Sequence, residues 1–255
     1  MKIQGVVPDW NNGAKEYAAK ISDFCDIDVF TVPGFDHEPN VLNKAIDQCE
    51  ADYLWFLHVD DEILYPETAH ELAEFLDANP TVGVTCPNRE GEPRGFRQPF
   101  KWYLADNTCV MYRKSVGVQF DSDFVFTGWN DLDFGESVIN AGYDVAIYGL
   151  LSVLKHPTPY GSWSSFRNAY NARNRLLLEA KWWWIGIDFW QGVDYYNQHQ
   201  ATKTTKIPTM FELAWWSEDK LTKFAESVDM EHPQIYIRND QQPGNADWSI
   251  NKLNF

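Results

Sequence analysis

Short apolar runs alternate with amphipathic stretches along the first part of the chain. Ile3–Val7, Ile27–Val32 and Tyr53–Leu57 are mainly apolar segments of strand length, typical of buried strands, and Tyr53–Leu57 is wholly apolar. Between them, Ala14–Phe24 and the segment that opens at Pro39-Asn40 place their apolar residues at helical spacing. This strand-helix order predicts a parallel sheet with right-handed crossovers.

The rest of the chain continues the pattern. Further strands are predicted at Val82–Cys86, Asn107–Tyr112 and Val145–Leu154, and further helices at Glu67–Ala78, Asn130–Asn140, Trp163–Lys181 and Thr209–Val228. The last stretch, Asp229–Phe255, is rich in Asn, Asp, Gln and Pro and is expected to be a loosely packed tail. We expect an α/β domain over residues 1–180, with a mostly parallel central sheet flanked by helices, and a helical, aromatic C-terminal extension over 181–255.

Composition narrows the function classes. The 255 residues carry a net charge of −16, which excludes a broad basic surface for duplex DNA, although the Arg167–Lys181 segment is densely basic. A 44 % apolar content is enough for a core. The four cysteines form no CxxC pair, and the sequence contains neither a signal-peptide pattern nor an apolar run of membrane-spanning length. We therefore expect a soluble cytoplasmic protein with reduced thiols.

An acidic cluster, Asp60-Asp61-Glu62, follows the third apolar run directly. In open α/β sheets, ligands bind at the carboxyl ends of the strands, where this cluster is predicted to lie. Adjacent carboxylates repel one another unless a cation or hydrogen-bond donors neutralise them. The cluster therefore indicates a divalent metal site, and the alternative is a solvated acidic turn before a helix.

Several motifs in a fixed order resemble the family 2 glycosyltransferases, which have the GT-A fold. They are Val6–Asn11, Asn43–Ile46, Tyr53–Ile63 with Pro66, Asn107–Arg113, Gly128–Asp133 with Gly142-Tyr143, His156 and Asn171–Arg175. The resemblance covers roughly residues 1–180. It implies a GT-A-like nucleotide-sugar-binding fold and an inverting transfer of a hexosyl or related sugar from a nucleoside diphosphate donor to an acceptor hydroxyl.

The resemblance also implies a bound Mn²⁺ or Mg²⁺ beside the donor diphosphate. Such a cation stabilises the negative charge that gathers on the leaving diphosphate, and it is held by one or two protein ligands, donor phosphates and water. By the match, Asp61 would be the metal carboxylate, and Asp60 would hold the ribose or share the metal. His156 would complete the coordination, and an imidazole ligand favours Mn²⁺ over Mg²⁺.

Inversion in one displacement needs a base that takes the proton of the acceptor. Asp131 matches the family's catalytic acid, at the start of a predicted helix whose dipole favours an ionised carboxylate. The alternative is an ordinary acid at a helix start. Asp133 is the second candidate base, and its alternative is a place on a solvated face.

The resemblance further implies a set of donor-binding residues. They are Pro8, Asp9, Trp10, Asp36, Asn43, Asp60 and Arg173. Asp36 would replace the acid that reads the nucleobase in the family, because the Asp-rich turn after the second strand is missing. Arg173 and Arg175 are two positions apart on a predicted helix, so at most one is expected to reach the diphosphate. Their alternative is a surface face paired with nearby acids.

Aromatic residues are abundant near the predicted acceptor side. Trp102, Tyr103, Trp129 and Trp163 could stack on a sugar or a base, although packing in the core is the alternative for each. The run Trp182–Trp184 cannot face one core on any single periodicity, so part of it is expected to contact a partner, an acceptor, a membrane surface or the C-terminal segment.

Three other functions stay open at this point. The acceptor could be a modified nucleobase in DNA if Arg167–Lys181 formed the contact surface. The chain could be a non-catalytic carbohydrate-binding protein on the same fold, which would not need Asp131 across a pocket from the metal carboxylates. A nucleotidyltransferase ranks last because Pro8–Gly13 is a poor phosphate loop. The donor sugar, nucleobase, acceptor and oligomeric state are not determined by the sequence.

Overall fold

The computed structural model describes residues 1–10, 13–34, 37–89, 100–101, 109–126, 128–155, 164–182 and 207–228. Within these ranges, the side chains of residues 88–89, 100–101, 147 and 149–155 are not described. Among the described residues, no helix combines the length and the apolarity that crossing a membrane requires. The four cysteines are free and buried.

Strands and helices alternate along the chain. The strands are β1 (Ile3–Asp9), β2 (Asp28–Pro33), β3 (Tyr53–Phe56), β4 (Glu62–Ile63), β5 (Val82–Arg89), β6 (Phe100–Lys101), β7 (Val110–Arg113) and β8 (Asp144–Lys155). The helices are α1 (Ala14–Cys25), α2 (Glu38–Gln48), α3 (Thr68–Ala78), the 3-10 turn η1 (Lys114–Val116), α4 (Asn130–Asn140), α5 (Ser165–Trp182), α7 (Met210–Ala214) and α8 (Glu218–Glu226).

One mixed sheet, in the order β2-β1-β3-β7-β5-β8-β4, forms the centre of the molecule, and β6 pairs with β8. The predicted parallel arrangement of the first three strands is confirmed, because β1 pairs in parallel with both β2 and β3. β5 and β8 form the other long parallel pair. The sequence did not predict that β7 would lie antiparallel between β3 and β5, or that the acidic cluster would lead into the short strand β4.

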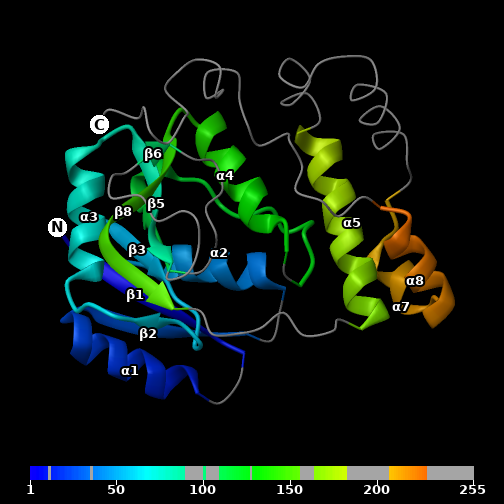
Figure 1. Ribbon diagram of the computed structural model, residues 1–255, viewed down its shortest axis with the longest axis horizontal. Coiled ribbons are helices and arrows are strands. Elements are labelled where there is room, and N and C mark those ends of the chain that lie inside the picture. The colour runs from blue at the N-terminus through cyan, green and yellow to red at the C-terminus, as the bar shows by residue number, and fades with distance from the viewer. Residues whose placement is uncertain are drawn as a thin grey trace.

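Helices cover both faces of this sheet (Figure 1). On one face, α1 and α3 pack on side chains such as Trp55 and Met111. On the other face, α2 and α4 pack on Leu54, Phe56 and Tyr112. Successive residues of β3 therefore enter opposite cores, as expected for a strand buried on both faces. The predicted α/β architecture of sheet and flanking helices is confirmed.

A smaller group of helices lies beyond α4 (Figure 1). α5 contacts α4 through Leu178 and Trp182, and it contacts α7 and α8 through Leu213 and Leu221. The prediction of one helix over Thr209–Val228 is wrong, because the segment forms two helices. A capping box at Thr209 starts α7, and the Ser217 side chain caps α8, so the chain turns between them. The domain division at residue 180 stays a prediction.

Candidate functional site

The carboxyl ends of β1 and β2 meet at one edge of the sheet. The Gly34 N–H donates to the Asp9 carbonyl (3.0 Å) where β2 ends. A Cβ at Gly34 would lie 2.7 Å from that same carbonyl oxygen, so this close approach requires glycine. Pro8 is buried, Asp9 is half-buried and Trp10 is exposed at this edge. Three of the predicted donor-binding residues therefore lie where α/β folds bind ligands.

The acidic turn after β3 is held by its own carboxylate. Asp61 Oδ2 accepts the His58 N–H (2.8 Å), and the Asp61 N–H donates to the His58 carbonyl (3.0 Å). The Tyr17 hydroxyl donates to the Asp61 carbonyl (2.8 Å). Burial, followed by the charge of Asp61, raises the pKa of Tyr17, so this hydroxyl stays protonated and keeps donating. The turn is thus fixed to α1 as well as to β3.

The two carboxylates of this turn differ in exposure. Asp61 is only 4 % exposed, whereas Asp60 is half-buried. In the part of the chain that the structure describes, no group of three His, Cys, Asp or Glu side chains forms a metal cluster. His156, the predicted third ligand, lies outside the described residues, as does Asp36. Two adjacent carboxylates suit a hard cation that keeps water or phosphate oxygens among its ligands.

The first turn of α4 carries the predicted catalytic base. Asp131 is half-buried, and its Oδ1 accepts the N–H of Leu132 (2.9 Å). Trp129 precedes the helix in the left-handed region (φ 66°), which is uncommon for a bulky side chain and marks a constrained turn. The start of α4 therefore presents an accessible carboxylate from a backbone of defined shape.

Glu38, at the first position of α2, joins the acidic turn to the start of α4. Its Oε1 lies 3.6 Å from His58 Nε2, and its Oε2 accepts from Asn130 Nδ2 (3.2 Å). Its backbone N–H donates to the Phe126 carbonyl (2.8 Å). The segments that carry Asp60-Asp61 and Asp131 thus meet around one buried side chain. Sequence reasoning missed Glu38, because an acid before proline at a helix start looks like an ordinary helix-dipole partner.

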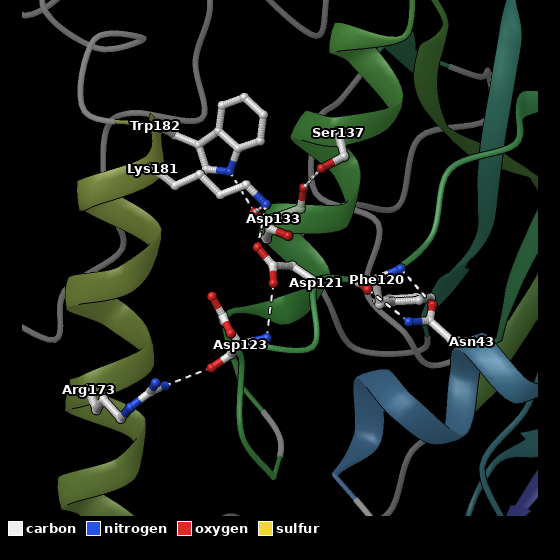
Figure 2. Close-up of polar contacts among 9 residues, drawn as sticks. All are labelled: Asn43, Phe120, Asp121, Asp123, Asp133, Ser137, Arg173, Lys181 and Trp182. Carbon is white, nitrogen blue, oxygen red and sulfur yellow. Dashed lines mark hydrogen bonds and ion pairs between the residues drawn. The ribbon is translucent and has the colours of Figure 1, made fainter. Parts of the chain in front are cut away.

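Asp133, the second candidate base, belongs to a different contact. Figure 2 shows it between α4 and α5, where Trp182 Nε1 donates to its Oδ1 (2.7 Å) and Lys181 Nζ lies 2.8 Å from the same oxygen. Lys181 also pairs with Asp121 (2.8 Å). Asp133 is 1 % exposed, so its placement on a solvated face is wrong. Burial raises the pKa of Asp133, and Lys181 and Trp182 oppose that shift without reversing it.

Two predicted donor-binding residues, Asn43 and Arg173, contact neighbouring backbone (Figure 2). The Asn43 amide donates to the Phe120 carbonyl (2.8 Å) and accepts the Phe120 N–H (2.7 Å). The Arg173 guanidinium donates to the carbonyls of Asp123 (2.8 Å) and Pro208 (2.9 Å). These contacts give no support to donor binding by Asn43 or Arg173, because their polar atoms tie α2 and α5 to neighbouring backbone.

Two further basic side chains of α5, Arg175 and Lys181, make contacts inside the molecule, whereas Arg167 is exposed. Arg175 is buried, pairs with Glu179 and lies over the Trp129 ring, 5.4 Å from its centroid. Lys181 is paired as described above. Arg175 and Lys181 thus pair with nearby acids, as the alternative expected, but Arg175 is buried, so the surface face of that alternative is wrong for it. The Arg173 guanidinium bonds to backbone carbonyls.

The loop before α4 is held by amide side chains of α5. Asn174 donates to the carbonyls of Val125 (2.8 Å) and Gly128 (3.1 Å) and accepts the Val125 N–H (3.2 Å). Phe126 in this loop has a positive φ of 55° and is exposed, with the Tyr170 ring 4.8 Å away. The exposed Phe126 ring and its contact with Tyr170 were not predicted from the sequence. The predicted aromatic residues Trp102, Tyr103 and Trp163 lie outside the described residues, whereas Trp129 packs against α5.

No protein-family model and no curated protein sequence matches the chain. Among solved structures, it is similar to GalNAc-T7 with UDP, GalNAc and Mn²⁺, with a TM-score of 0.56 and 11 % identity. That match covers 89 % of this chain and 54 % of GalNAc-T7, so the chain spans about half of that protein.

A second similar structure is the mannosyltransferase PcManGT from Pyrobaculum calidifontis in complex with GDP-Man and Mn²⁺. Its TM-score is 0.53 at 12 % identity, and the match covers 89 % of this chain and 73 % of PcManGT. Identities this low establish a shared fold only. The chain therefore has the GT-A fold of these glycosyltransferases.

Proposed function

We propose that this chain is a metal-dependent, inverting glycosyltransferase that moves a sugar from a nucleoside diphosphate sugar to the hydroxyl of a saccharide or another acceptor. The observation that carries the proposal is the meeting of two segments around Glu38. His58 leads into the Asp60-Asp61 turn, and Asn130 directly precedes Asp131. Two predicted functional segments, far apart in the sequence, thus share one contact at the carboxyl edge of the sheet.

In this proposal, Asp60 and Asp61 hold Mn²⁺ or Mg²⁺, and His156 is the third protein ligand. The bound cation would neutralise the charge that develops on the leaving diphosphate. The two carboxylates fit this role, since Asp60 is half-buried and the backbone of the turn is fixed through Asp61. Asp9 and Trp10 lie at the same sheet edge, where they would contact the nucleoside. The two similar structures contain a nucleotide or nucleotide sugar together with Mn²⁺, which supports this choice of donor.

Asp131 is the proposed base that takes the proton of the acceptor hydroxyl. It is half-buried in the first turn of α4, where the helix dipole favours its ionised form. Asp133, two positions later, is enclosed by Lys181 and Trp182 and does not suit this role. The exposed Phe126 ring, beside the start of α4, offers a flat apolar surface to an acceptor sugar.

A modified nucleobase in DNA is disfavoured as the acceptor. That alternative needed a basic contact surface on α5, and Arg173, Arg175 and Lys181 are occupied by contacts within the molecule. A non-catalytic sugar-binding protein would share the fold and the aromatic side chains. It would bind the donor but would not transfer the sugar.

A thermal-shift screen tests this proposal. UDP, GDP and their sugar conjugates are added with and without Mn²⁺, because a true donor stabilises the folded state by mass action. We expect at least one nucleotide to raise the Tm, with a larger shift when Mn²⁺ is present. The Asp61→Ala variant should lose the Mn²⁺-dependent part of that shift. Wild-type protein that responds to no nucleotide in either condition would refute the proposed function.

A further inference from the structure

Within the described residues, the buried Glu38 carboxylate contacts no lysine or arginine. It is 4 % exposed, and its side chain contacts the amide of Asn130 at 3.2 Å and the imidazole of His58 at 3.6 Å. Burying a carboxylate is unfavourable unless it is paired and hydrogen-bonded. A neutral amide and a partly exposed imidazole compensate this burial less fully than a close lysine or arginine would. The position of Glu38 therefore calls for an explanation beyond stability.

The contacts of Glu38 form one continuous path. The Asn130 amide donates to Glu38, Glu38 Oε1 lies 3.6 Å from the His58 imidazole, and the backbone N–H of His58 donates to the Asp61 carboxylate (2.8 Å). The path thus runs from the start of α4 to the carboxylate of the acidic turn. Because the Glu38 N–H also donates to the Phe126 carbonyl, the same residue holds the loop that leads into α4. Residues that hold a metal ligand in place without touching the metal orient the ligating carboxylate and affect metal affinity.

We propose that Glu38 is a positioning residue, which fixes the metal-binding turn relative to the helix that carries Asp131. It acts through His58 on one side and through Asn130 on the other, and it touches neither the donor nor the metal. This inference rests on the proposed function, since it assigns a role to Glu38 only if the Asp60-Asp61 turn binds a cation. A purely structural Glu38 would stabilise the fold and leave the affinity of the folded protein for metal and nucleotide unchanged.

The test uses Glu38→Asp and Glu38→Gln in the full chain, with Mn²⁺ and UDP or GDP as probes. The aspartate keeps the charge but is one methylene shorter, so it cannot reach both partners. We expect Mn²⁺-dependent nucleotide binding, measured by calorimetry, to weaken about 10- to 100-fold in Glu38→Asp. Glu38→Gln keeps the side-chain length and one acceptor oxygen for Asn130, and its NH2 group can face His58, so we expect it to bind within about threefold of wild type.

Glu179→Ala is the matched control. Glu179 is also a buried carboxylate, but it pairs with Arg175 on α5, away from the acidic turn. It should lower the urea midpoint and leave Mn²⁺-dependent binding by the folded protein unchanged. If Glu38→Asp does not fold, Asn130→Ser replaces it, because a shorter hydroxyl cannot reach Glu38; a several-fold loss of Mn²⁺-dependent affinity is then expected.

Three results would count against these proposals. If wild-type protein binds neither nucleotide in the presence of Mn²⁺, both the proposed function and this inference are refuted. Wild-type protein that binds, together with a folded Glu38→Asp that binds equally well, overturns the inference alone. Equal weakening in Glu38→Asp and Glu179→Ala would also overturn it, because the effect would then follow stability and not position.

Discussion

The two sides of α4 hold their buried carboxylates in different ways. Toward α5, Asp133 pairs with the Lys181 ammonium at 2.8 Å and accepts the indole N–H of Trp182 at 2.7 Å. Toward α2, Glu38 receives a neutral amide at 3.2 Å and lies 3.6 Å from an imidazole. Short, charge-assisted contacts lock two helices together. The longer and weaker contacts of Glu38 lie beside the proposed site. Buried ionisable groups whose charge is only partly compensated are typical of functional sites.

Two acids on the same short helix, Asp131 and Asp133, also lie in different environments. Asp131 is half-buried at the helix start, and Asp133 is enclosed between α4 and α5. Both residues are aspartates in the first turn of α4. Their environments differ, because Lys181 and Trp182 of α5 enclose Asp133, whereas Asp131 is half-buried.

The largest effect is expected from a matched pair of substitutions on α4. Asp131→Asn removes the proposed base and should lower sugar transfer about 10²- to 10⁴-fold with little change in stability. Asp133→Asn should lower the urea midpoint and keep transfer per folded molecule within about threefold. Both variants are assayed with the donor found in the thermal-shift screen. Equal transfer rates for Asp131→Asn and wild type would contradict the assignment of the base.

Removing the Lys181 ammonium group on α5 should have the next largest effect, which is a loss of stability. Lys181→Met leaves Asp133 buried without its ammonium partner. We expect a loss of about 2–4 kcal/mol in the free energy of unfolding, below the value for a fully buried pair because the Lys181 side chain is 33 % exposed. Urea denaturation measures it. Lys223→Met, at an exposed pair with Asp219, is the control and should change stability by less than about 0.5 kcal/mol.

A smaller effect is expected at the loop before α4. Gly128 has a φ of +96°, and a Cβ there would lie 2.5 Å from Asn171 Oδ1. Gly128→Ala should cost about 1–3 kcal/mol through backbone strain and this clash. Gly117→Ala is the matched control, because Gly117 also has a positive φ of +72° but faces open space. Thermal unfolding should show the larger loss for Gly128→Ala, and Asn171→Ala should relieve part of it. Equal losses at both glycines would exclude the clash.

The smallest effect concerns pH. Burial tends to raise the pKa of Asp121, but the hydrogen bonds from Lys181 and the Asp123 N–H outweigh it and lower the pKa. A lowered carboxyl pKa contributes stability that is present above the unfolded-state value, about 3.9, and is lost as the pH falls through the folded-state value. The Asp121→Asn variant should therefore show a flatter loss of stability below about pH 4. Asp219→Asn, on the exposed face of α8, should keep the wild-type slope.

Local patterns predicted much of the fold. The apolar runs of β1, β2 and β3, and the helical spacing of α1 and α2, are properties of neighbouring residues, so the sequence contains them directly. The antiparallel insertion of β7 between β3 and β5 is a long-range pairing that no local pattern encodes. The break between α7 and α8 depends on a single capping residue, Ser217, inside a helical pattern.

The site was predicted in part for a similar reason. The position of Asp61 after a buried strand and of Asp131 at a helix start could be inferred from their immediate neighbours. The burial of Asp133 depends on Lys181, which is 48 positions away in the sequence and was expected on a basic surface. The environment of Glu38 likewise depends on two distant segments, which contribute His58 and Asn130. Partners of buried charges are set by tertiary packing, which residue type does not reveal.

The central claim is that the Asp60-Asp61 turn, and not the acidic contact between α4 and α5, binds a metal-nucleotide complex. Calorimetric titration of UDP and GDP in the presence of Mn²⁺ tests it most directly, with wild type, the Asp60→Asn/Asp61→Asn double variant and Asp133→Asn compared under folded conditions. We predict that Mn²⁺-dependent binding is lost in the double variant and kept in Asp133→Asn. Undiminished binding by a folded double variant would contradict the account.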